Sequence, residues 1–317
     1  MKKYLPWLGI LILAIIVVAA LVMGGPQLSV VHILNPLLMI VIPIILWVVL
    51  NRTFRLGWRL FFFGAFCFVL SQVFHLPFNF LVVSPLTERM GWQPIAGSPG
   101  LACISVIAGL STGLFENITR YFVLRLWARE ARDWERGLTF GAGHGGGEAL
   151  ILGLLSLVTM FQVLALRGVD LSTVLPAEQV EAAQAQIDAY WTTPWYLFLL
   201  APLERIWAIC LHICTTLLVV RSLVRRNLAW LGAAVLLHAL LDTFAVYANT
   251  SWGPLPAEAG IMLIGLACLA LIFYLRRHLP SSSGLHHPGQ GGPAAVASGI
   301  PPSDDLTREQ IEESRFG

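Results

Sequence analysis

The sequence predicts an all-α protein, a polytopic membrane helix bundle of about eight transmembrane helices. Hydrophobic residues make up 57% of the 317-residue chain and charged residues only 12%, and the mean hydropathy is +0.75. Soluble domains carry about 25% charged residues. The apolar residues form separate runs near the ~20 residues that a helix needs to cross a bilayer. A net charge of +2, without a basic run interleaved with aromatic residues, gives no indication of nucleic-acid binding.

The first apolar run, within Met1–Met23, follows Lys2 and Lys3 and is interpreted as a retained membrane helix at 5–23. Its composition also fits a signal peptide. However, ~17 apolar residues are long for the apolar part of such a peptide, and Met23-Gly-Gly-Pro-Gln is a poor cleavage site. Seven further spans of suitable length are expected. They lie near residues 30–50, 59–83, 101–125, 138–166, 194–220, 228–248 and 257–276.

The loops between these spans predict the orientation of the chain. Lys and Arg concentrate in every second loop, whereas the alternate loops hold only Arg89 and Arg167. Because cytoplasmic loops carry the excess of basic residues, both termini of this multi-pass protein of the cell membrane are expected in the cytoplasm. The basic set comprises Lys2, Lys3, Arg52, Arg55, Arg59, Arg125, Arg129, Arg132, Arg136, Arg221, Arg225, Arg226, Arg276 and Arg277.

Two segments outside the predicted spans differ from the rest in composition. The stretch from Ala177 to Tyr190 is amphipathic and acidic, and it is expected to lie at the membrane surface. The transmembrane bundle is expected to occupy residues 1–279. The tail 280–317 is rich in Ser, Gly and Pro and cannot bury a core, so it is expected to be a disordered cytoplasmic segment.

A glycine-rich segment in the fifth predicted span, from Phe140 to Gly153, carries His144 and Glu148. These two side chains are four residues apart and therefore share one face of a helix. Ionisable groups inside a membrane are costly, so they are functional candidates by default. The glycines around them allow another backbone to come close, or allow the helix to begin irregularly.

Four other spans also carry polar groups that do not suit lipid. Counting ~1.5 Å per helical residue from the cytoplasmic ends places five side chains in one layer, about 9–15 Å deep. These are Glu116, His144, Glu148, His212 and His238. The remaining polar groups of these spans are Ser71, Gln72, His75, Asn79, Asn117, Arg120, Glu204, Arg205 and Asp242.

Each of these groups has a structural interpretation beside the functional one. Glu116 and Arg120 are spaced as an intrahelical ion pair, and His144 and Glu148 suit hydrogen bonds between helices. His238 and Asp242 have the spacing of a structural histidine held by a carboxylate. Glu204 and Arg205 favour a structural pairing with Asp242 or a neighbour, and Ser71, His75 and Asn79 favour helix packing or support of the site.

Three spacings resemble the motifs of the CAAX-protease and bacteriocin-processing superfamily of intramembrane proteases. The Gly-His-Gly-Gly-x-Glu-Ala form of the second motif is similar, more narrowly, to the YhfC family of that group. The resemblance covers residues 30 to 276. One departure is Asn117, where the superfamily usually has a second adjacent glutamate. The three motifs are Glu116-Asn-Ile-Thr-Arg120, Phe140-x-x-x-His144 and His238-x-x-x-Asp242, and the segment Ser71-Gln-Val-Phe-His-Leu-Pro-Phe-Asn79 fits the family as well.

This resemblance implies an endopeptidase that hydrolyses a membrane-associated protein or peptide. Glu116 with His144 is then the pair that activates water, and His238 with Asp242 binds the oxyanion or orients the substrate. Glu148 is additional to the general pattern and shares or replaces the role of base. The residues expected to support this set are Arg120, which holds Glu116 ionised, and His212, Asn117, Glu204, Arg205, His75 and Asn79.

Other mechanisms and functions fit the same residues. No metal or other cofactor is favoured, but a zinc protease remains open, because His144, His212 and His238, with Glu148 or Asp242, supply enough ligands for a catalytic site. A proton-coupled transporter also buries histidines and carboxylates. A non-catalytic membrane scaffold is the third alternative. The absence of an internal sequence repeat weakens a transporter built from inverted repeats.

Overall fold

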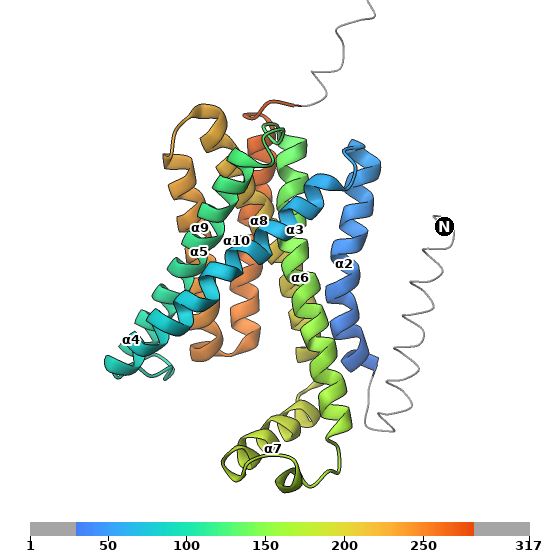
Figure 1. The fold of residues 1–317 in the computed structure, drawn as a ribbon, viewed down its shortest axis with the longest axis vertical. Coiled ribbons are helices and arrows are strands. Elements are labelled where there is room, and N and C mark those ends of the chain that lie inside the picture. Colours follow the sequence, from blue (N-terminus) through green and yellow to red (C-terminus); the bar gives the residue numbers. More distant parts are fainter. Residues whose placement is uncertain (1–29, 282–317) are drawn as a thin grey trace, which may run out of the picture. The chain divides into compact units, whose positions relative to one another are not determined.

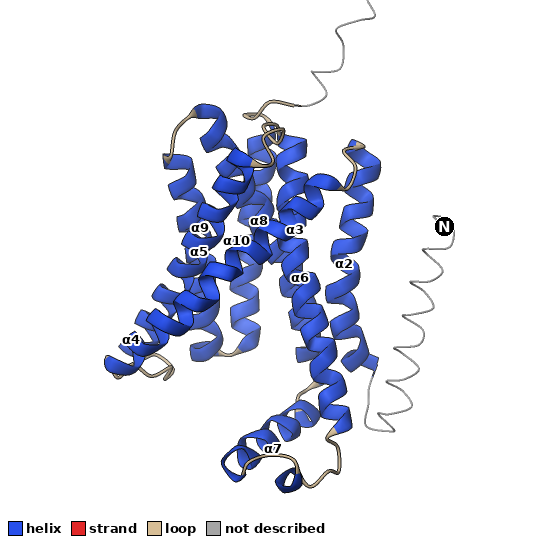
Figure 2. Cartoon of the chain, viewed as in Figure 1, coloured by secondary structure: helices blue, strands red, loops and turns tan. Residues whose placement is uncertain are grey.

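The computed structural model describes residues 30–281 as a bundle of helices (Figure 1). Within this range the chain forms helices, turns and loops, without a strand (Figure 2). Seven of the described helical segments are long and apolar enough to cross a membrane. The predicted fold class, an all-α polytopic membrane bundle, is therefore confirmed. The expected span at 5–23 and the tail from residue 282 onward lie outside the described residues.

The helices are named as in Figure 1. A π-helical turn, Asn79–Val83, joins α3 to α4, and a 3-10 turn, Trp195–Leu199, leads into α8. The amphipathic stretch expected from Ala177 is the helix α7. The helices are α2 (Val30–Phe54), α3 (Arg59–Phe78), α4 (Ser84–Arg89), α5 (Pro99–Leu126), α6 (Trp134–Ala165), α7 (Ala177–Thr192), α8 (Leu200–Arg225), α9 (Ala229–Trp252) and α10 (Pro254–Arg276).

The second described span is longer than the expected range 59–83, because the helical path continues from Arg59 to Arg89. Its 31 residues measure about 46 Å at ~1.5 Å per residue, more than the ~30 Å of bilayer hydrocarbon. A helix of this length must tilt, and α3 runs obliquely across its neighbours in Figure 1. Pro77 has no backbone N–H to donate, and the wider π turn follows it directly.

Local sequence explains where the helices of the bundle begin. Ser98 caps α5 by accepting a hydrogen bond from the Leu101 backbone N–H, and Pro99 occupies the first turn. Asp133 caps α6 in the same way through the backbone N–H of Arg136. The α9 and α10 helices are separated by Gly253, whose φ of +84° is readily adopted only by glycine. These caps define the ends of the helices that carry the polar side chains.

α8 is the central helix of the bundle. In the span Trp195–Arg225, 72% of the most apolar stretch is buried, against 39% or less in the other six spans. It packs against α6, α9, α10 and α5, while α6 also packs against α2 and α3. A polar side chain on the inner face of α8 can therefore reach side chains from helices on several sides.

The glycines around His144 allow α3 and α6 to approach each other closely. A Cβ at Gly143 would lie 2.0 Å from the Phe61 carbonyl oxygen, and one at Gly64 would lie 2.0 Å from the Phe140 carbonyl oxygen. Helix α6 begins at Trp134, well before this segment, so the glycines do not mark an irregular helix start. They serve backbone contact between helices, as small residues do in membrane bundles.

The close contact at Gly143 predicts a large cost for a small side chain. Gly143→Ala should destabilise the bundle by ~1–3 kcal/mol, because the new methyl group overlaps the backbone of α3. Gly232→Ala in α9 is the matched control, since its Cβ would meet nothing within 4 Å; it should be neutral or stabilising. Thermal unfolding of the two variants in detergent measures the difference, and equal melting temperatures would contradict this packing role.

Candidate active site

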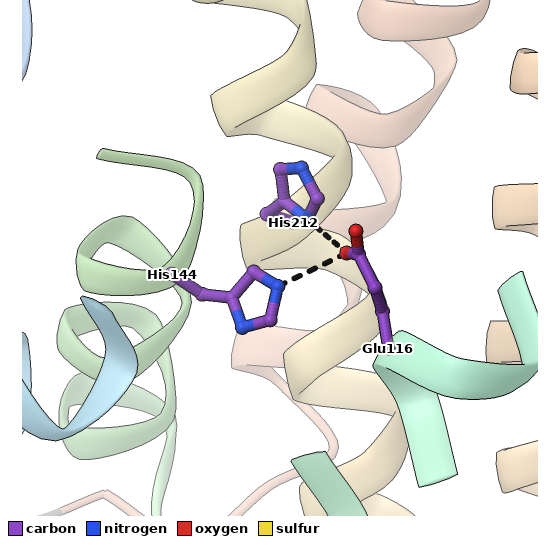
Figure 3. Close-up of side chains that lie close together, drawn as sticks. All are labelled: Glu116, His144 and His212. Atoms are coloured by element: carbon purple, nitrogen blue, oxygen red, sulfur yellow. Dashed lines mark hydrogen bonds and ion pairs between the residues drawn. The ribbon is translucent and has the colours of Figure 1, made fainter. Parts of the chain in front are cut away.

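The carboxylate of Glu116, on α5, is the centre of a buried polar cluster (Figure 3). Glu116 is only 3% exposed. Its Oε2 atom lies 3.0 Å from His144 Nε2, 3.7 Å from His212 Nδ1 and 3.9 Å from His238 Nε2. Arg120 Nη2 lies 3.8 Å from the same oxygen. Helices α5, α6, α8 and α9 thus bring one carboxylate, three imidazoles and one guanidinium together inside the bundle.

His144 reaches this cluster from the glycine-rich face of α6. It is fully buried, and its ring lies edge-on to Phe68, with the ring centroids 5.6 Å apart. A carboxylate only accepts hydrogen bonds, so Nε2–H of His144 donates to Glu116. The other ring nitrogen, Nδ1, has no hydrogen-bond partner among the described residues. The side chain is therefore held by packing on one side and by Glu116 on the other.

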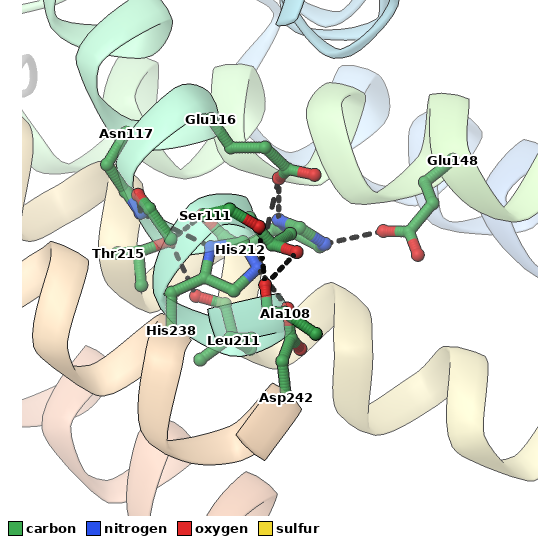
Figure 4. Close-up of polar contacts among 12 residues, drawn as sticks. Ala108, Ser111, Glu116, Asn117, Glu148, Leu211, His212, Thr215, His238 and Asp242 are labelled. Atoms are coloured by element: carbon green, nitrogen blue, oxygen red, sulfur yellow. Dashed lines mark hydrogen bonds and ion pairs between the residues drawn. The ribbon is translucent and has the colours of Figure 1, made fainter. Parts of the chain in front are cut away.

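Glu148 does not join His144 in an intrahelical pair but contacts α8 instead (Figure 4). Its Oε2 accepts a hydrogen bond of 2.6 Å from His212 Nε2, and its Oε1 accepts one of 2.6 Å from Arg205 Nη1. Arg205 also donates to Glu204. The expected pairing of Glu204 and Arg205 is present, but the carboxylate that joins it is Glu148 and not Asp242.

The hydrogen bonds of His212 determine which of its nitrogens carries the proton. Arg120 Nη2 lies 3.2 Å from His212 Nδ1, and a guanidinium only donates. His212 Nδ1 is therefore the bare nitrogen and Nε2–H is the donor to Glu148. The bare nitrogen is also the one that lies nearest to Glu116.

The contact with Asn117 determines which nitrogen of His238 carries the proton. Its Nδ2 donates to the Gly113 carbonyl at 2.8 Å and approaches His238 Nδ1 at 3.2 Å. His238 Nδ1 must then accept, and Nε2 carries the hydrogen. That Nε2–H lies 3.5 Å from Asp242 Oδ2 and points toward the Glu116 side of the cluster. Asn117, the departure from the superfamily motif, thus has a definite role in the network.

Arg120 is fully buried, and its direct hydrogen bonds go mainly to residues other than Glu116. It donates to Asn117 Oδ1, to Thr215 Oγ1 at 3.0 Å and to His212 Nδ1. Its separation from Glu116 is an ion-pair distance, not that of a short hydrogen bond. Arg120 therefore joins α5 to α8 beside the carboxylate while supplying the compensating charge.

Two residues of the cluster had no assigned role in the sequence. Gln72 Nε2 donates to Glu116 Oε1 at 3.2 Å and so holds the second carboxylate oxygen. Thr215 accepts from Arg120, and the only sequence signal for it is its position three residues after His212, on the same face of α8. His75 lies 3.1 Å from Ser111 Oγ, a contact that joins α3 to α5 beside the site, and 3.0 Å from Asn79 Nδ2 in the π turn that follows α3.

The donor atoms of Glu116, His144 and His212 fit a metal ion. One ligand atom from each residue lies within 4.8 Å of the others, and all three residues are buried. Zinc with ligands at ~2.0–2.1 Å in a tetrahedral site places its ligand atoms roughly 3.3–3.5 Å apart. The observed separations of 3.0 and 3.7 Å from Glu116 Oε2 bracket that value. His238 is not part of this three-residue donor group, and its Nε2 lies farther away, 3.9 Å from Glu116 Oε2. A metal bound to the group would replace the hydrogen that His144 Nε2 donates to Glu116.

The contact between His212 and Glu148 also matches a metal site. Metal-binding histidines usually donate their other N–H to a carboxylate, which fixes the ring and its tautomer. Glu148 accepts from Nε2 of His212, and this leaves Nδ1 directed at the three-residue donor group. The residues present therefore have both the ligand atoms and the supporting carboxylate that a metal requires.

A family model described as YhfC intramembrane metalloprotease matches residues 38–263. The chain belongs to this family. A relative described as uncharacterized membrane protein YhfC, from Bacillus subtilis (strain 168), is 32% identical over 210 residues, which cover 65% of this chain and 79% of that protein. No solved structure matches the chain.

Family membership confirms, at the level of the YhfC family, the resemblance drawn from the second motif. The description of that family also indicates a metal cofactor. The sequence favoured no metal, and the name metalloprotease gives this preference no support. The buried Glu116, His144 and His212 donors make zinc plausible. The wider placement in the CAAX-protease superfamily stays a prediction.

The burial of Arg120 predicts a strong effect on folding. Arg120→Ala should destabilise the protein by ~3–5 kcal/mol, because it leaves Glu116 buried without its nearest positive charge. Arg89→Ala, at an exposed position at the end of α4, is the control and should change stability by no more than ~0.5 kcal/mol. Thermal unfolding in detergent compares them, and a stable Arg120→Ala protein would refute the role of this guanidinium.

Proposed function

We propose that this protein is a metal-dependent intramembrane endopeptidase that cleaves a membrane-associated protein or peptide. Glu116, His144 and His212 are the proposed metal ligands. The observation that carries the proposal is the convergence of their three donor atoms within 4.8 Å, at buried positions of a membrane bundle. Membership of a family described as intramembrane metalloproteases supports the same function.

The proposed reaction divides between the metal and the residues around it. A bound zinc ion lowers the pKa of a coordinated water and polarises a carbonyl oxygen. Glu148 orients His212 through the 2.6 Å hydrogen bond to Nε2, and Gln72 fixes the second oxygen of Glu116. Burial of these groups keeps bulk water away, so each electrostatic contact is stronger than it would be in solution.

His238 is the proposed donor to the oxyanion that develops on the peptide carbonyl. Its Nε2–H is available because Asn117 occupies Nδ1. Asp242, 3.5 Å from that Nε2, is 75% buried at its side chain and forms no ion pair with a described Lys or Arg. In the metal mechanism we assign to Asp242 the acceptance of a proton from the attacking water and its transfer to the leaving amine, which requires an acid near the scissile bond.

One contact favours a second mechanism in the same active site. Arg120 Nη2 lies 3.2 Å from His212 Nδ1, the nitrogen that a metal would need. In the metal-free alternative Arg120 keeps this contact, Glu116 takes the proton of the attacking water, and His144 orients that water. This is the mechanism that the wider superfamily resemblance implies.

Metal content, measured beside peptide cleavage, separates the two mechanisms. The metal mechanism predicts about one metal ion per purified wild-type chain, loss of that ion in His212→Ala, and loss of peptide cleavage with a chelator. His278→Ala is the control, since His278 is exposed after α10 and should leave metal content unchanged. Metal-free wild-type protein that cleaves peptides in chelator, and in which Glu116→Gln lowers turnover by at least ~10²-fold, would establish the alternative.

His238 has the same expected effect under both mechanisms. His238→Ala should lower kcat by ~10²–10³-fold, because it removes a donor to the oxyanion, and it should change KM little. Metal content should stay at the wild-type level, since His238 is not among the proposed ligands. Steady-state kinetics with a fluorogenic membrane peptide, together with metal analysis, measures both quantities. Loss of the metal in this variant would make His238 a ligand instead.

The proposed orientation places both ends of the chain in the cytoplasm. Its support is the concentration of Lys and Arg in alternate loops. With this orientation the C-terminal end of α8, which carries Arg221 and Arg225, faces the cytoplasm. The α9–α10 connection lies on the opposite side of the membrane. A reporter fused after Arg277 should give a cytoplasmic signal, and an extracytoplasmic signal there would reverse the model.

A further inference from the structure

A polar cavity of about 370 Å³ lies where α9 ends and α10 begins. It is lined by side chains of α8, α9 and α10, and its polar lining includes Glu204, Glu258, Asn249 and Thr250. We call it the acidic pocket. None of its lining residues belongs to the Glu116 cluster. Its volume suits an amino-acid side chain with part of its backbone better than a single ion.

The acidic pocket contains a buried carboxylate without a partner. Glu258 is only 7% exposed, and its Oε1 atom forms no hydrogen bond with a described residue. A buried carboxylate without a donor is costly, so such an atom is usually satisfied by something that binds to it. Glu258 lines the cavity, so a rotation of its carboxylate would present Oε1 to a ligand in the acidic pocket.

The charges around the acidic pocket determine which sign of charge on a ligand is favoured. Glu204 and Glu258 line it. Among residues 30–281, the one arginine that pairs with these lining carboxylates is Arg205, which is shared between Glu204 and Glu148. Asp242 lies on α9, one turn before the lining residue Val246. Carboxylates therefore outnumber the cation, and a positively charged group gains most from entering.

The acidic pocket lies on the helix face that also carries the proposed oxyanion donor. Ala245, Val246 and Asn249 follow Asp242 by three, four and seven residues, the spacing of one helix face. Ala245 is seven residues after His238, which corresponds to about 10 Å along the helix. An extended peptide covers that distance in roughly three residues, at ~3.3–3.6 Å each.

We propose that the acidic pocket is the substrate subsite for a lysine or arginine side chain, about three residues from the cleaved bond. This assignment rests on the proposed peptidase function and adds a specificity to it. The ammonium or guanidinium donates to Glu258 Oε1 and to Glu204. Asn249 and Thr250 offer further polar contacts at the mouth of the pocket.

The pocket is also connected to the metal-ligand candidates through hydrogen bonds. Glu204 accepts from Arg205, Arg205 donates to Glu148, and Glu148 accepts from His212. A bound cation that pairs with Glu204 displaces Arg205 from that carboxylate. Arg205 then keeps its contact with Glu148. Occupation of the acidic pocket and the orientation of His212 therefore share one chain of contacts.

The test measures peptide binding instead of cleavage. The probes are fluorescent 20-residue Leu/Ala peptides, each with one Lys at a defined position, and matched peptides with norleucine in its place. The full-length protein carries Glu116→Gln, so that bound peptide is not cut. At the favoured position, Lys should tighten binding by about tenfold or more over norleucine, which is the scale measured for close charge pairs.

Glu258→Gln should abolish this preference for Lys while leaving the affinity for the norleucine peptide unchanged. Glu204→Gln, at a more exposed side chain, should reduce the preference for Lys. This variant tests the subsite if Glu258→Gln does not fold. The matched control is Glu181→Gln on the exposed surface of α7, which should retain the full preference. Gel filtration and melting temperature establish that each variant is folded.

The outcomes distinguish this subsite from the proposed function. Equal binding of Lys and norleucine peptides at every position would overturn the subsite, whether or not the wild type cleaves peptides. A Lys preference that depends on Glu258, in a protein that never cleaves, would support the subsite and refute the peptidase. If phosphatidylethanolamine vesicles remove the Lys preference and phosphatidylcholine vesicles do not, the occupant is a lipid amine and the proposal fails. A divalent ion lost on Glu258→Gln would overturn it as well.

Discussion

Burying the Glu116 carboxylate is the physical constraint on which the rest of the site depends. A lone carboxylate in a medium of low dielectric constant is very costly, so it must be paired and hydrogen-bonded. Glu116 is 3% exposed and has Arg120 and the three imidazoles of His144, His212 and His238 within 4 Å. Supplying these partners requires α6, α8 and α9 to meet α5 at one depth. The contact of α3 with α6 through Gly64 and Gly143 meets the same demand, because it brings Gln72 to the second oxygen.

Much of this arrangement could be predicted from helix periodicity. Counting residues from the helix ends placed Glu116, His144, Glu148, His212 and His238 in one layer. The structure brings the three imidazoles to Glu116, and Glu148 contacts the far side of the His212 ring. Depth along a helix follows from a fixed rise per residue, so it survives errors of a few residues at the boundaries. The all-α fold followed from composition and from the length of the apolar runs for the same reason.

The partners of each side chain could not be predicted in this way. The four-residue spacing of His144 and Glu148 predicted a shared helix face and suited hydrogen bonds between helices, but it did not indicate which helix each side chain meets. His144 bonds to Glu116 on α5, and Glu148 bonds to His212 on α8. Spacing on one helix gives a shared face, but the rotation of that helix against its neighbours decides which partner is met. Thr215 was missed for the same reason, because an isolated Thr in an apolar helix carries no sign of the arginine opposite it.

Arg120 connects the two mechanisms that the site can support. Its contact with His212 Nδ1 competes with a metal ion for that nitrogen, and a guanidinium close to a cation is also repelled by it. However, a guanidinium has five N–H donors, and Arg120 retains Asn117 and Thr215 when one contact is lost. Giving up His212 leaves the buried Nη2 of Arg120 with Glu116 alone, at 3.8 Å, while Nη1 keeps its bonds. Asn117 stays in place and continues to hold the proton of His238 on Nε2. The oxyanion donor is thus prepared in the same way whether Glu116 binds a metal or accepts a proton. The two states differ instead in the contact of Arg120 with His212 and in the hydrogen on His144 Nε2, which a metal would replace.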